Sequence, residues 1–241
     1  MIAIDITRKL FPAKGRAGQH TAIADFRLSL QPNEFVCLVG PSGCGKTTLL
    51  NIFAALDHDY EGSIRFDQQN AQPKIGYVFQ NTRLLPWCTV RENIELAIED
   101  NLSSENIDAL LDVMQLSQFQ HVYPERLSLG MSRRVAIIRA FAINPNVLLM
   151  DEPFVSLDAA TARQIRELTI QLWQQRPHNV VFVTHDLREA ISLADRIVFL
   201  AAAPMKVIAE TTVTIPRSER ENEQSIEIFR QQLLQDYPRL L

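Results

Sequence analysis

The sequence is poor in the residues that mark several large protein classes. Its three cysteines, Cys37, Cys44 and Cys88, are an odd number without metal-ligand spacing. That pattern argues against a disulfide framework or a structural zinc site, and it suits a reducing compartment. No apolar run approaches the ~18 residues that cross a bilayer, and the longest, Ile197–Ala203, stops at Pro204. We therefore expect neither a disulfide-stapled nor a membrane-spanning protein.

Positive charge is limited as well. The 241 residues include 24 lysines and arginines against 28 aspartates and glutamates, and the formal net charge is −4. A protein whose main partner is nucleic acid usually carries excess positive charge, so we expect no nucleic-acid partner. The length suits one large domain, or one domain with a subdomain, around a substantial core.

One glycine-bearing segment carries most of the functional information. Residues 40–48 read GPSGCGKTT and match the phosphate-binding pattern G-x-x-x-x-G-K-[ST]. Glycines let the backbone curl so that N–H groups point at a triphosphate, and a helix starting near Gly45 adds the positive end of its dipole. Lys46 supplies a cation for the outer phosphates, and Thr47 supplies a hydroxyl for Mg²⁺. The expected nucleotide-binding residues of this phosphate loop are Gly40, Pro41, Ser42, Gly43, Cys44, Gly45, Lys46, Thr47 and Thr48. The sequence therefore predicts a protein that binds a nucleoside triphosphate.

Short apolar segments alternate with helical patterns along much of the chain. The buried-strand candidates are Phe35–Val39, Ile75–Phe79, Val147–Met150, Val180–Val183 and Ile197–Leu200. Such runs are typical of a parallel sheet that is covered on both faces. The alternation of strands with helices predicts an α/β fold.

The middle of the chain has a different pattern. Residues 86–139 show helical periodicity and little strand signal. The capping box from Thr89 to Glu92 leads into apolar positions spaced four apart, and a second apolar stripe runs from Ile107 to Met114. We interpret this segment as a helical subdomain inserted into a single domain of residues 1–241, whose α/β core comprises residues 1–85 and 140–241.

Polar residues follow two of the expected strands. Asp151 and Glu152 come after the apolar run Val147–Leu149, at the strand end where open α/β sheets bind ligands. There Asp151 is placed to hold Mg²⁺ through water, and Glu152 to polarise an attacking water. Capping of a helix is the alternative function of such a pair. His185 follows Val180–Thr184 and is placed to hydrogen-bond a γ-phosphate, although a lone histidine is more often structural.

The order of these motifs resembles the ATP-binding subunit of an ABC transporter. After the phosphate loop come Gln80, LSLGM (Leu127–Met131), VLLMDEP (Val147–Pro153), SLD (Ser156–Asp158) and His185. The ordered match covers about residues 1–200, so it is more specific than any single motif. It implies an ATPase that uses ATP and Mg²⁺. The implied fold is an α/β P-loop NTPase core with a mostly parallel sheet, an N-terminal antiparallel β portion and an inserted helical subdomain.

The resemblance implies roles for residues around the bound nucleotide. Thr47, Gln80 and Asp151 are the expected Mg²⁺ ligands, and Gln80 belongs to the Q-loop that joins metal and water to the membrane partner. Glu152 matches the general base, and His185 resembles the switch histidine. The expected catalytic residues are thus Glu152, His185 and Gln80.

Further residues are implied to contact ATP or a second subunit. Phe11 is in about the right place to stack on adenine, with burial in the core as the alternative. Ser128 and Gly130 stand where a hydroxyl and an amide reach across a dimer to the other subunit's γ-phosphate, and Asp158 faces that subunit. Leu129 replaces a glycine that the family usually has. A side chain there can crowd the close backbone approach, or it is harmless if it points away and only the amide matters. We expect Leu129 to lower turnover without stopping ATP binding.

The segment from Val78 to Ile94 resembles the nitrate, sulfonate and taurine importer group, whose members often read F-Q-x-x-R-L-L-P-W-x-T-V. It implies a subunit that powers solute import as a homodimer with ATP at the interface, at the cytoplasmic face of the cell inner membrane. The implied partners are transmembrane permease subunits and, indirectly, a periplasmic or extracellular solute-binding protein. Leu84–Trp87 would grip a helix of the permease, or Trp87 packs inside the helical subdomain.

Three other functions are alternatives. The ATPase of an exporter or lipoprotein-release complex shares the same core, and only residues 86–90 argue against it. A soluble ABC ATPase that acts on nucleic acid or ribosomes usually has two ATPase halves, long coiled coils or basic extensions, which we do not find here. A small-molecule kinase would leave LSLGM and SLD unexplained.

Overall fold

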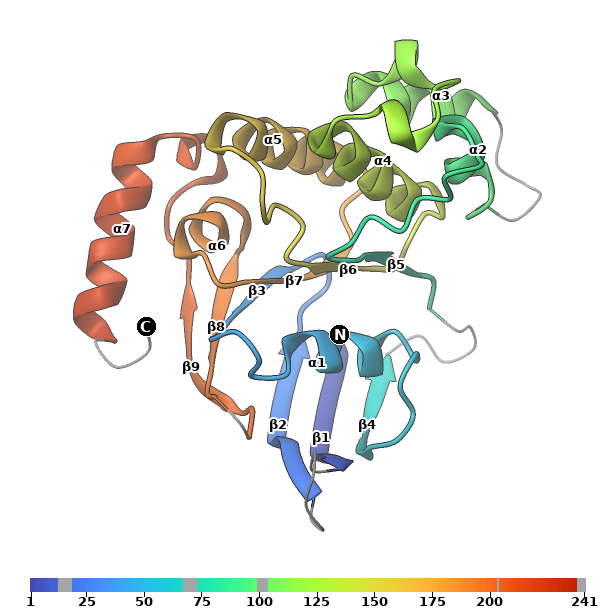
Figure 1. Ribbon diagram of the computed structural model, residues 1–241. Coiled ribbons are helices and arrows are strands. Elements are labelled where there is room, and N and C mark those ends of the chain that lie inside the picture. Colours follow the sequence, from blue (N-terminus) through green and yellow to red (C-terminus); the bar gives the residue numbers. More distant parts are fainter. Residues whose placement is uncertain (13–18, 67–72, 99–103, 203, 238–241) are drawn as a thin grey trace. The chain divides into compact units, whose positions relative to one another are not determined.

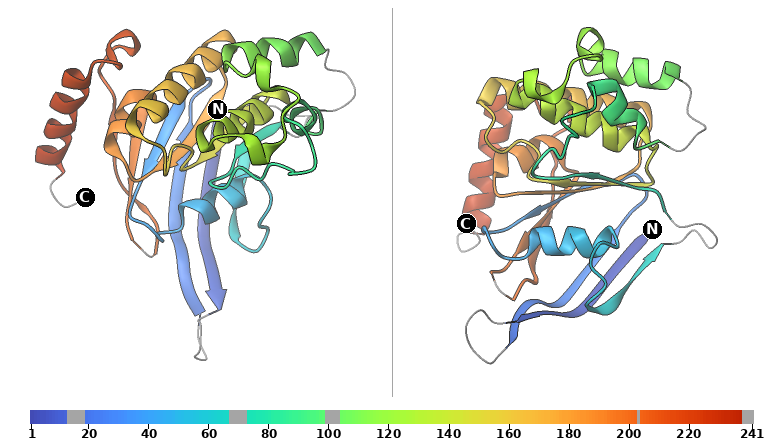
Figure 2. Two further views of the ribbon diagram at one scale, coloured as in Figure 1. Left: turned by 45° about the horizontal axis from the view of Figure 1, so that its top comes forward. Right: turned by 45° about the vertical axis from the view of Figure 1, so that its right-hand side comes forward.

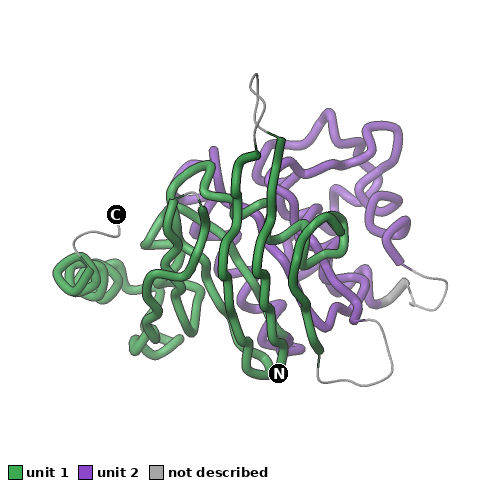
Figure 3. The backbone as a smooth tube through the Cα atoms, turned by 90° about the horizontal axis from the view of Figure 1, so that it is seen from below, with its two compact units in different colours: residues 1–71, 179–241 green, residues 72–178 purple. Residues whose placement is uncertain are grey.

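The computed structural model describes residues 1–12, 19–66, 73–98, 104–202 and 204–237. The chain divides into two compact units, shown in Figure 3. Unit 1 comprises residues 1–71 and 179–241, and unit 2 comprises residues 72–178. Within the described ranges, every helix is too short or too polar to cross a membrane.

Unit 1 contains an antiparallel sheet of three strands. β1 (Ile2–Pro12) lies between β2 (Gln19–Leu30) and β4 (Glu61–Phe66), and both views in Figure 2 show β1 and β2 as long paired strands. Alternate residues from Ile2 to Ile6 are buried, because successive side chains of a strand point to opposite faces. The antiparallel portion expected at the N-terminus is confirmed.

A second set of strands in unit 1 is mostly parallel. Its order is β7 (Asn179–Thr184), β3 (Phe35–Val39), β8 (Arg196–Leu200) and β9 (Val207–Thr212). β3 is parallel to β7 and β8, whereas β9 is antiparallel to β8. All residues of β3 and β7 are buried, as in strands covered on both faces. These strands place the loops that follow β3 and β7 at one edge.

The helices of unit 1 are α1 (Lys46–Phe53), α6 (Leu187–Leu193) and α7 (Glu223–Asp236). α6 packs on β3, and α7 lies alongside α6 (Figure 1). Arg188 of α6 donates to Glu223 (3.3 Å) and Glu227 (2.5 Å) of α7. The last helix is therefore tied to α6 by charged hydrogen bonds as well as by its buried stripe.

In its described residues, unit 2 combines two parallel strands with four α-helices. β5 (Ile75–Val78) pairs with β6 (Val147–Asp151), and the helices are α2 (Val90–Glu95), α3 (Ser104–Val113), α4 (Leu129–Ala142) and α5 (Ala159–Gln175). Figure 1 shows α4 and α5 side by side. The predicted capping box is present, since Thr89 N donates to Glu92 Oε2 (2.6 Å) and Glu92 N donates to Thr89 Oγ1 (3.3 Å). Parallel strands joined through helices confirm the α/β prediction.

Candidate nucleotide-binding and catalytic residues

The phosphate loop joins β3 to α1 in unit 1. Gly43 and Gly45 have φ angles of 78° and 110°, in the left-handed region that favours glycine. The described first turn of α1 contains no acidic residue to offset the positive end of the helix dipole. Lys46 is 6% exposed, and its Nζ donates to the carbonyl oxygens of Gly40 (2.8 Å) and Pro41 (3.1 Å). The loop thus has the curled backbone and the ordered cation that phosphate binding requires.

The remaining residues of the phosphate loop divide into an exposed tip and a packed base. Ser42 and Thr47 are exposed, whereas Cys44 is buried. A Cβ at Gly40 would lie 3.0 Å from Leu200 Cβ and 3.1 Å from Cys44 Sγ, so glycine is needed there for close packing. Cys44 therefore fills space beneath the loop, and Thr47 keeps its hydroxyl accessible.

His185 emerges at the same sheet edge as the phosphate loop. In the parallel pair of β3 and β7, Val39 lies opposite Thr184, so Gly40 and His185 are the next residues of the two strands. The amide of Asp186 donates to Thr184 Oγ1 (3.0 Å), which fixes the turn around the exposed His185. The histidine therefore stands where open parallel sheets bind ligands.

Phe11 lies near the end of β1, in the three-stranded sheet. It is 37% exposed, so it is not a core residue. The Nζ of Lys9 lies 4.8 Å from the ring centroid, and the same atom donates to Asp57 Oδ1 (2.9 Å) and Asp59 O (2.7 Å). A cation over one ring face orients the ring. The sequence reasoning missed Lys9, and stacking of Phe11 on adenine stays a prediction.

Two neighbouring strands of unit 2, β5 and β6, have their carboxyl ends at the same edge. At or just beyond these ends lie Gln80, Asp151 and Glu152. Val78 of β5 lies opposite Met150 of β6, so the segments that follow diverge from adjacent positions. Asp151 is 3% exposed, and Glu152 has a φ of 43°. Seven other described non-glycine residues also have a positive φ, so this angle does not by itself mark Glu152 as functional. Glu152 directly follows β6, and its function as the base stays a prediction.

The predicted cross-dimer segment forms the start of α4. Ser128 is the N-cap, and its Oγ accepts a hydrogen bond from the Met131 amide (3.2 Å). Leu129 is 48% exposed, so its side chain faces solvent and does not pack on the subunit's own core. Gly130 is buried against α5, where a Cβ would lie 2.7 Å from Thr161 Cγ2. Ser128 and Leu129 are therefore accessible to a second molecule.

Asp158 has a structural function in the subunit itself. It is the N-cap of α5 and accepts a hydrogen bond from the Thr161 amide (3.0 Å). Hydrogen bonds from the side chain and the amide of Thr161 lower the pKa of Asp158. An ionised carboxylate at a helix N-terminus is also favoured by the helix dipole. Contact of Asp158 with a second subunit stays a prediction.

Arginines of α4 are functional candidates that the sequence reasoning did not find. Arg133 is 3% exposed, and its Nη1 donates to the carbonyl oxygens of Gln80 (2.6 Å) and Phe79 (3.2 Å). The sequence did contain one signal for Arg133, because the family often has a glutamine at this position. Its partner could not be inferred, because the two segments are more than fifty residues apart.

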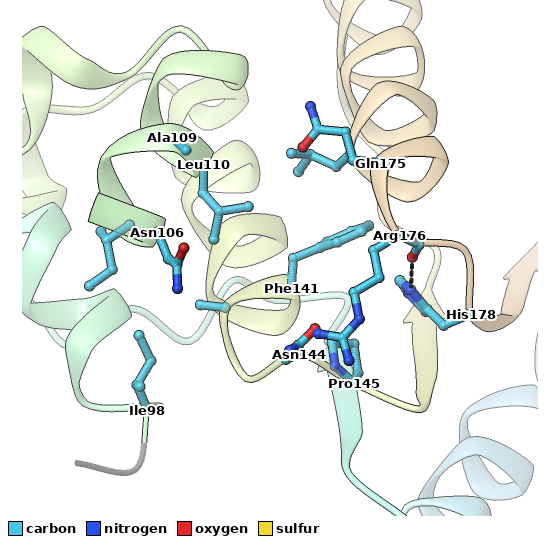
Figure 4. Close-up of a pocket in the computed structure, with 13 residues that line it drawn as sticks. Ile98, Asn106, Ala109, Leu110, Phe141, Asn144, Pro145, Gln175, Arg176 and His178 are labelled. Carbon is cyan, nitrogen blue, oxygen red and sulfur yellow. Dashed lines mark hydrogen bonds between the residues drawn. The ribbon is translucent and has the colours of Figure 1, made fainter. Parts of the chain in front are cut away.

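Unit 2 also has a cavity of about 260 Å³ between α3 and the carboxyl ends of α4 and α5 (Figure 4). Leu110 and Phe141 lie at this cavity together with the more polar Asn106, Gln175 and Arg176. The predicted site residues are not among those that line it. The cavity is thus separate from the candidate catalytic residues of unit 2.

The candidate metal ligands have the chemistry that Mg²⁺ prefers. Thr47, Gln80 and Asp151 all offer oxygen atoms, and Asp151 adds one buried carboxylate. Among the described residues, no group of three or more histidine, cysteine, aspartate or glutamate side chains forms a metal cage. Mg²⁺ is usually bound through one or two carboxylates together with substrate phosphates and water. The residues present fit that mode of binding.

Comparison with known proteins identifies the family. The family described as ABC transporter matches residues 23–155. An aliphatic sulfonates import ATP-binding protein, SsuB of Bacillus cereus, is 39% identical over 243 residues, which cover 98% of this chain and 95% of that protein. The chain belongs to the ABC transporter family. The nitrate import ATP-binding protein NrtD of Synechococcus elongatus is 40% identical over 233 residues, which cover 92% of this chain and 84% of that protein.

The fold of this ABC transporter protein agrees with that of a solved ATPase. A dimeric structure of the ATP-binding cassette MJ0796 in a post-hydrolysis state, bound to ADP and Pi, has a TM-score of 0.76 and 30% identity, covering 90% of this chain and all of that chain. Both the family and the fold class expected from the sequence are therefore confirmed. The protein is an ATP-binding ABC ATPase.

Proposed function

We propose that this ABC ATPase powers import of a small molecule such as an aliphatic sulfonate, taurine or nitrate. The observation that carries the proposal is the similarity, over nearly the full length, to import subunits for sulfonates and nitrate. The segment from Val78 to Ile94 supports the same group. The ATPase of an exporter has the same core, but an export function would not explain why Val78–Ile94 resembles the importer group.

The chain's own residues supply a hydrolytic mechanism. Lys46 and the amides of the phosphate loop hold the triphosphate. Because hydrogen bonds already restrain the Lys46 side chain, ATP binding costs less of its conformational entropy. Glu152 takes the proton from the attacking water, and His185 holds the γ-phosphate in line. Thr47, Gln80 and Asp151 would hold Mg²⁺, which would supply positive charge to the phosphate oxygens when bound.

Two copies of the chain complete the reaction in this proposal. Ser128 caps the start of α4, so its hydroxyl, the neighbouring amides and the helix dipole form an anion-binding end. Leu129 is exposed beside it, which fits a contact made by another molecule. The solved relative MJ0796 is itself a dimer. We infer that Ser128 and Gly130 approach the γ-phosphate held by the second copy, with Asp158 facing that copy.

Permease subunits bind the apolar side chains that follow the Q-loop. Trp87 is 72% exposed and Leu96 is 64% exposed, so Trp87 does not pack inside the helical region. Exposed aromatic and aliphatic residues of this kind are typical anchors of protein–protein contacts. The cavity lined by Leu110 and Phe141 offers a further socket for a partner side chain. Through the permease, the ATPase works at the cytoplasmic face of the membrane and responds to a solute-binding protein.

Reconstitution tests this proposal. The ATPase, its permease and the solute-binding protein are placed in liposomes, and ATP-driven uptake of an alkanesulfonate, taurine and nitrate is measured. We expect uptake of one of these solutes. Glu152→Gln should abolish turnover and uptake while ATP binding persists as a trapped closed dimer. Undiminished ATPase activity in Glu152→Gln would exclude Glu152 as the base, and absence of uptake of all three solutes would exclude the proposed substrates.

A further inference from the structure

Two arginines of α4 hold the backbone of the Q-loop segment, which we define as residues 79–83. Arg133 reaches the first part of this segment, as described above. Arg139 reaches the last part, because its Nη2 donates to Thr82 O (2.7 Å) and its Nη1 donates to Arg83 O (2.8 Å). Each guanidinium thus binds two carbonyl oxygens of the segment. Arg133 makes both bonds through Nη1, whereas Arg139 uses its two terminal nitrogens as a fork, which fixes orientation as well as distance.

The two hydrogen bonds of Arg133 and the bond from Arg139 to Thr82 O are partly buried, whereas the bond from Arg139 to Arg83 O is exposed. Arg133 is buried and Arg139 is half-buried, and burial lowers the pKa of both guanidinium groups. Hydrogen bonds of charged donors are stronger in such surroundings than at the surface, and a carbonyl that loses its buried donor incurs a desolvation penalty. The arginines therefore constrain the Q-loop segment more firmly than exposed side chains would.

The strand that leads into the Q-loop segment is in backbone contact with the same helix. A Cβ at Gly76 of β5 would lie 2.5 Å from the carbonyl oxygen of Ala140 in α4. Only glycine allows this approach, since a backbone atom cannot turn away as a flexible side chain does. α4 is thus attached to β5 and to the segment that follows it.

α4 also begins at the predicted cross-dimer contact. Ser128 caps it, and the helix continues through Arg133 and Arg139 to Ala142 without a break. An α-helix of this length spans about 20 Å and transmits a displacement of one end to the other. A displacement of α4 caused by a contact at Ser128 is therefore transmitted through this one rigid helix to the backbone of Gln80.

We propose that Arg133 and Arg139 are positioning residues that make the Q-loop segment move with α4, so that engagement of Ser128 by a second copy sets the position of Gln80. The dimer part of this inference rests on the function proposed above. Neither arginine touches nucleotide in this mechanism, and both act through Gln80. This positioning function explains why the buried Arg133 and the half-buried Arg139 are both bound to backbone carbonyl oxygens.

Hydrogen–deuterium exchange of the full-length protein tests the contact directly. In Arg139→Gln, we expect the amides of residues 79–85 to exchange at least about tenfold faster, because opening of the segment no longer breaks charged hydrogen bonds. Arg139→Lys keeps the charge but loses the fork, so its effect should be intermediate. Arg134→Gln is the matched control on the same helix, since Arg134 donates to Met114 O instead. Unchanged exchange in Arg139→Gln, or equal acceleration in Arg134→Gln, overturns the proposal.

A double-mutant cycle tests the route through Gln80. We expect Arg139→Gln to lower kcat about fivefold in the assembled complex without weakening ATP binding, and to have no further effect in a Gln80→Ala background. Additive effects of the two substitutions would show that Arg139 acts elsewhere and would overturn the positioning role. The exchange experiment needs neither ATP nor transport. Failure of the proposed import function therefore leaves its result intact and is recognised separately.

Discussion

Gly130 and Thr161 are in a contact that leaves no room for one more carbon atom. A Cβ at Gly130 would lie 2.7 Å from Cγ2 of Thr161, where α4 packs on α5. The family resemblance gives this glycine a function at a partner's phosphate, whereas the structure shows a second requirement inside the subunit. Thr161 also donates its amide to Asp158, so the contact joins two motifs that are both expected to face the dimer partner.

Gly130→Ala separates these two requirements. Alanine is the better helix former, yet the clash with the stiff β-branched Thr161 should destabilise the protein by about 1–3 kcal/mol. Thr161→Ser removes Cγ2, so the double variant should regain stability in urea unfolding. If Gly130 also has to approach a phosphate across the dimer, the ATPase rate of the double variant stays low. Full recovery of activity would show that packing alone requires the glycine.

Leu129→Gly should raise turnover. Leu129 is the first residue of α4 and is exposed, so its removal costs the subunit little packing. Without its side chain, the backbone at Ser128 can come closer to a partner's phosphate. We expect a higher hydrolysis rate in the assembled complex and an unchanged ATP affinity of the isolated subunit. An unchanged hydrolysis rate would mean that the leucine points away from the nucleotide in the dimer.

Strand ends explain why much of the candidate site was predictable from the sequence. The phosphate loop and His185 both follow apolar runs, and parallel strands bring their carboxyl ends to one edge. Asp151 and Glu152 were predicted by the same logic, whereas Gln80 came from the family resemblance. The parallel pairing of β5 and β6 accounts for its position near them. These positions depend on short local patterns that any reader of the sequence can recognise.

Contacts between distant segments were not predictable in this way. Arg133 and Arg139 bind carbonyl oxygens of residues 79–83, and a carbonyl group has no signature in the sequence. The requirement for Gly76 likewise arises only from the backbone of α4. The burial of Lys9, which is 2% exposed, also depends on distant partners, because they come from the loop after α1.

Lys9→Met should destabilise unit 1 and weaken ATP binding. Lys9 is buried and bound to Asp57, so its loss leaves a partly buried carboxylate without its cation and costs at least about 2 kcal/mol. It also removes the cation that orients Phe11. The matched control is Arg8→Met, because Arg8 pairs with Glu61 at the surface and should cost less than about 1 kcal/mol. Urea unfolding and ATP titration measure the two effects, and equal losses in both variants would contradict the burial argument.

His178→Gln should make stability less sensitive to mild acid. Burial lowers the pKa of His178, although the hydrogen bond between Nδ1 and Arg176 O (2.8 Å) opposes the shift. As pH falls below about 6.5, the unfolded chain gains a proton that the folded site resists, so a contribution to stability present above that pH is lost as pH approaches the lowered pKa.

Urea-unfolding midpoints at about pH 7.5 and about pH 5.5 measure this difference. We expect the wild-type midpoint to fall more between these conditions than that of His178→Gln. His58→Gln is the control, since it makes the same replacement at an exposed histidine. The ring centroids of His178 and Phe141 are 5.4 Å apart in the cavity wall. Protonation of His178 would therefore place a charge beside an aromatic ring and other apolar side chains. Identical pH dependence of all three proteins would show that His178 titrates alike in the folded and unfolded chains, which its burial argues against.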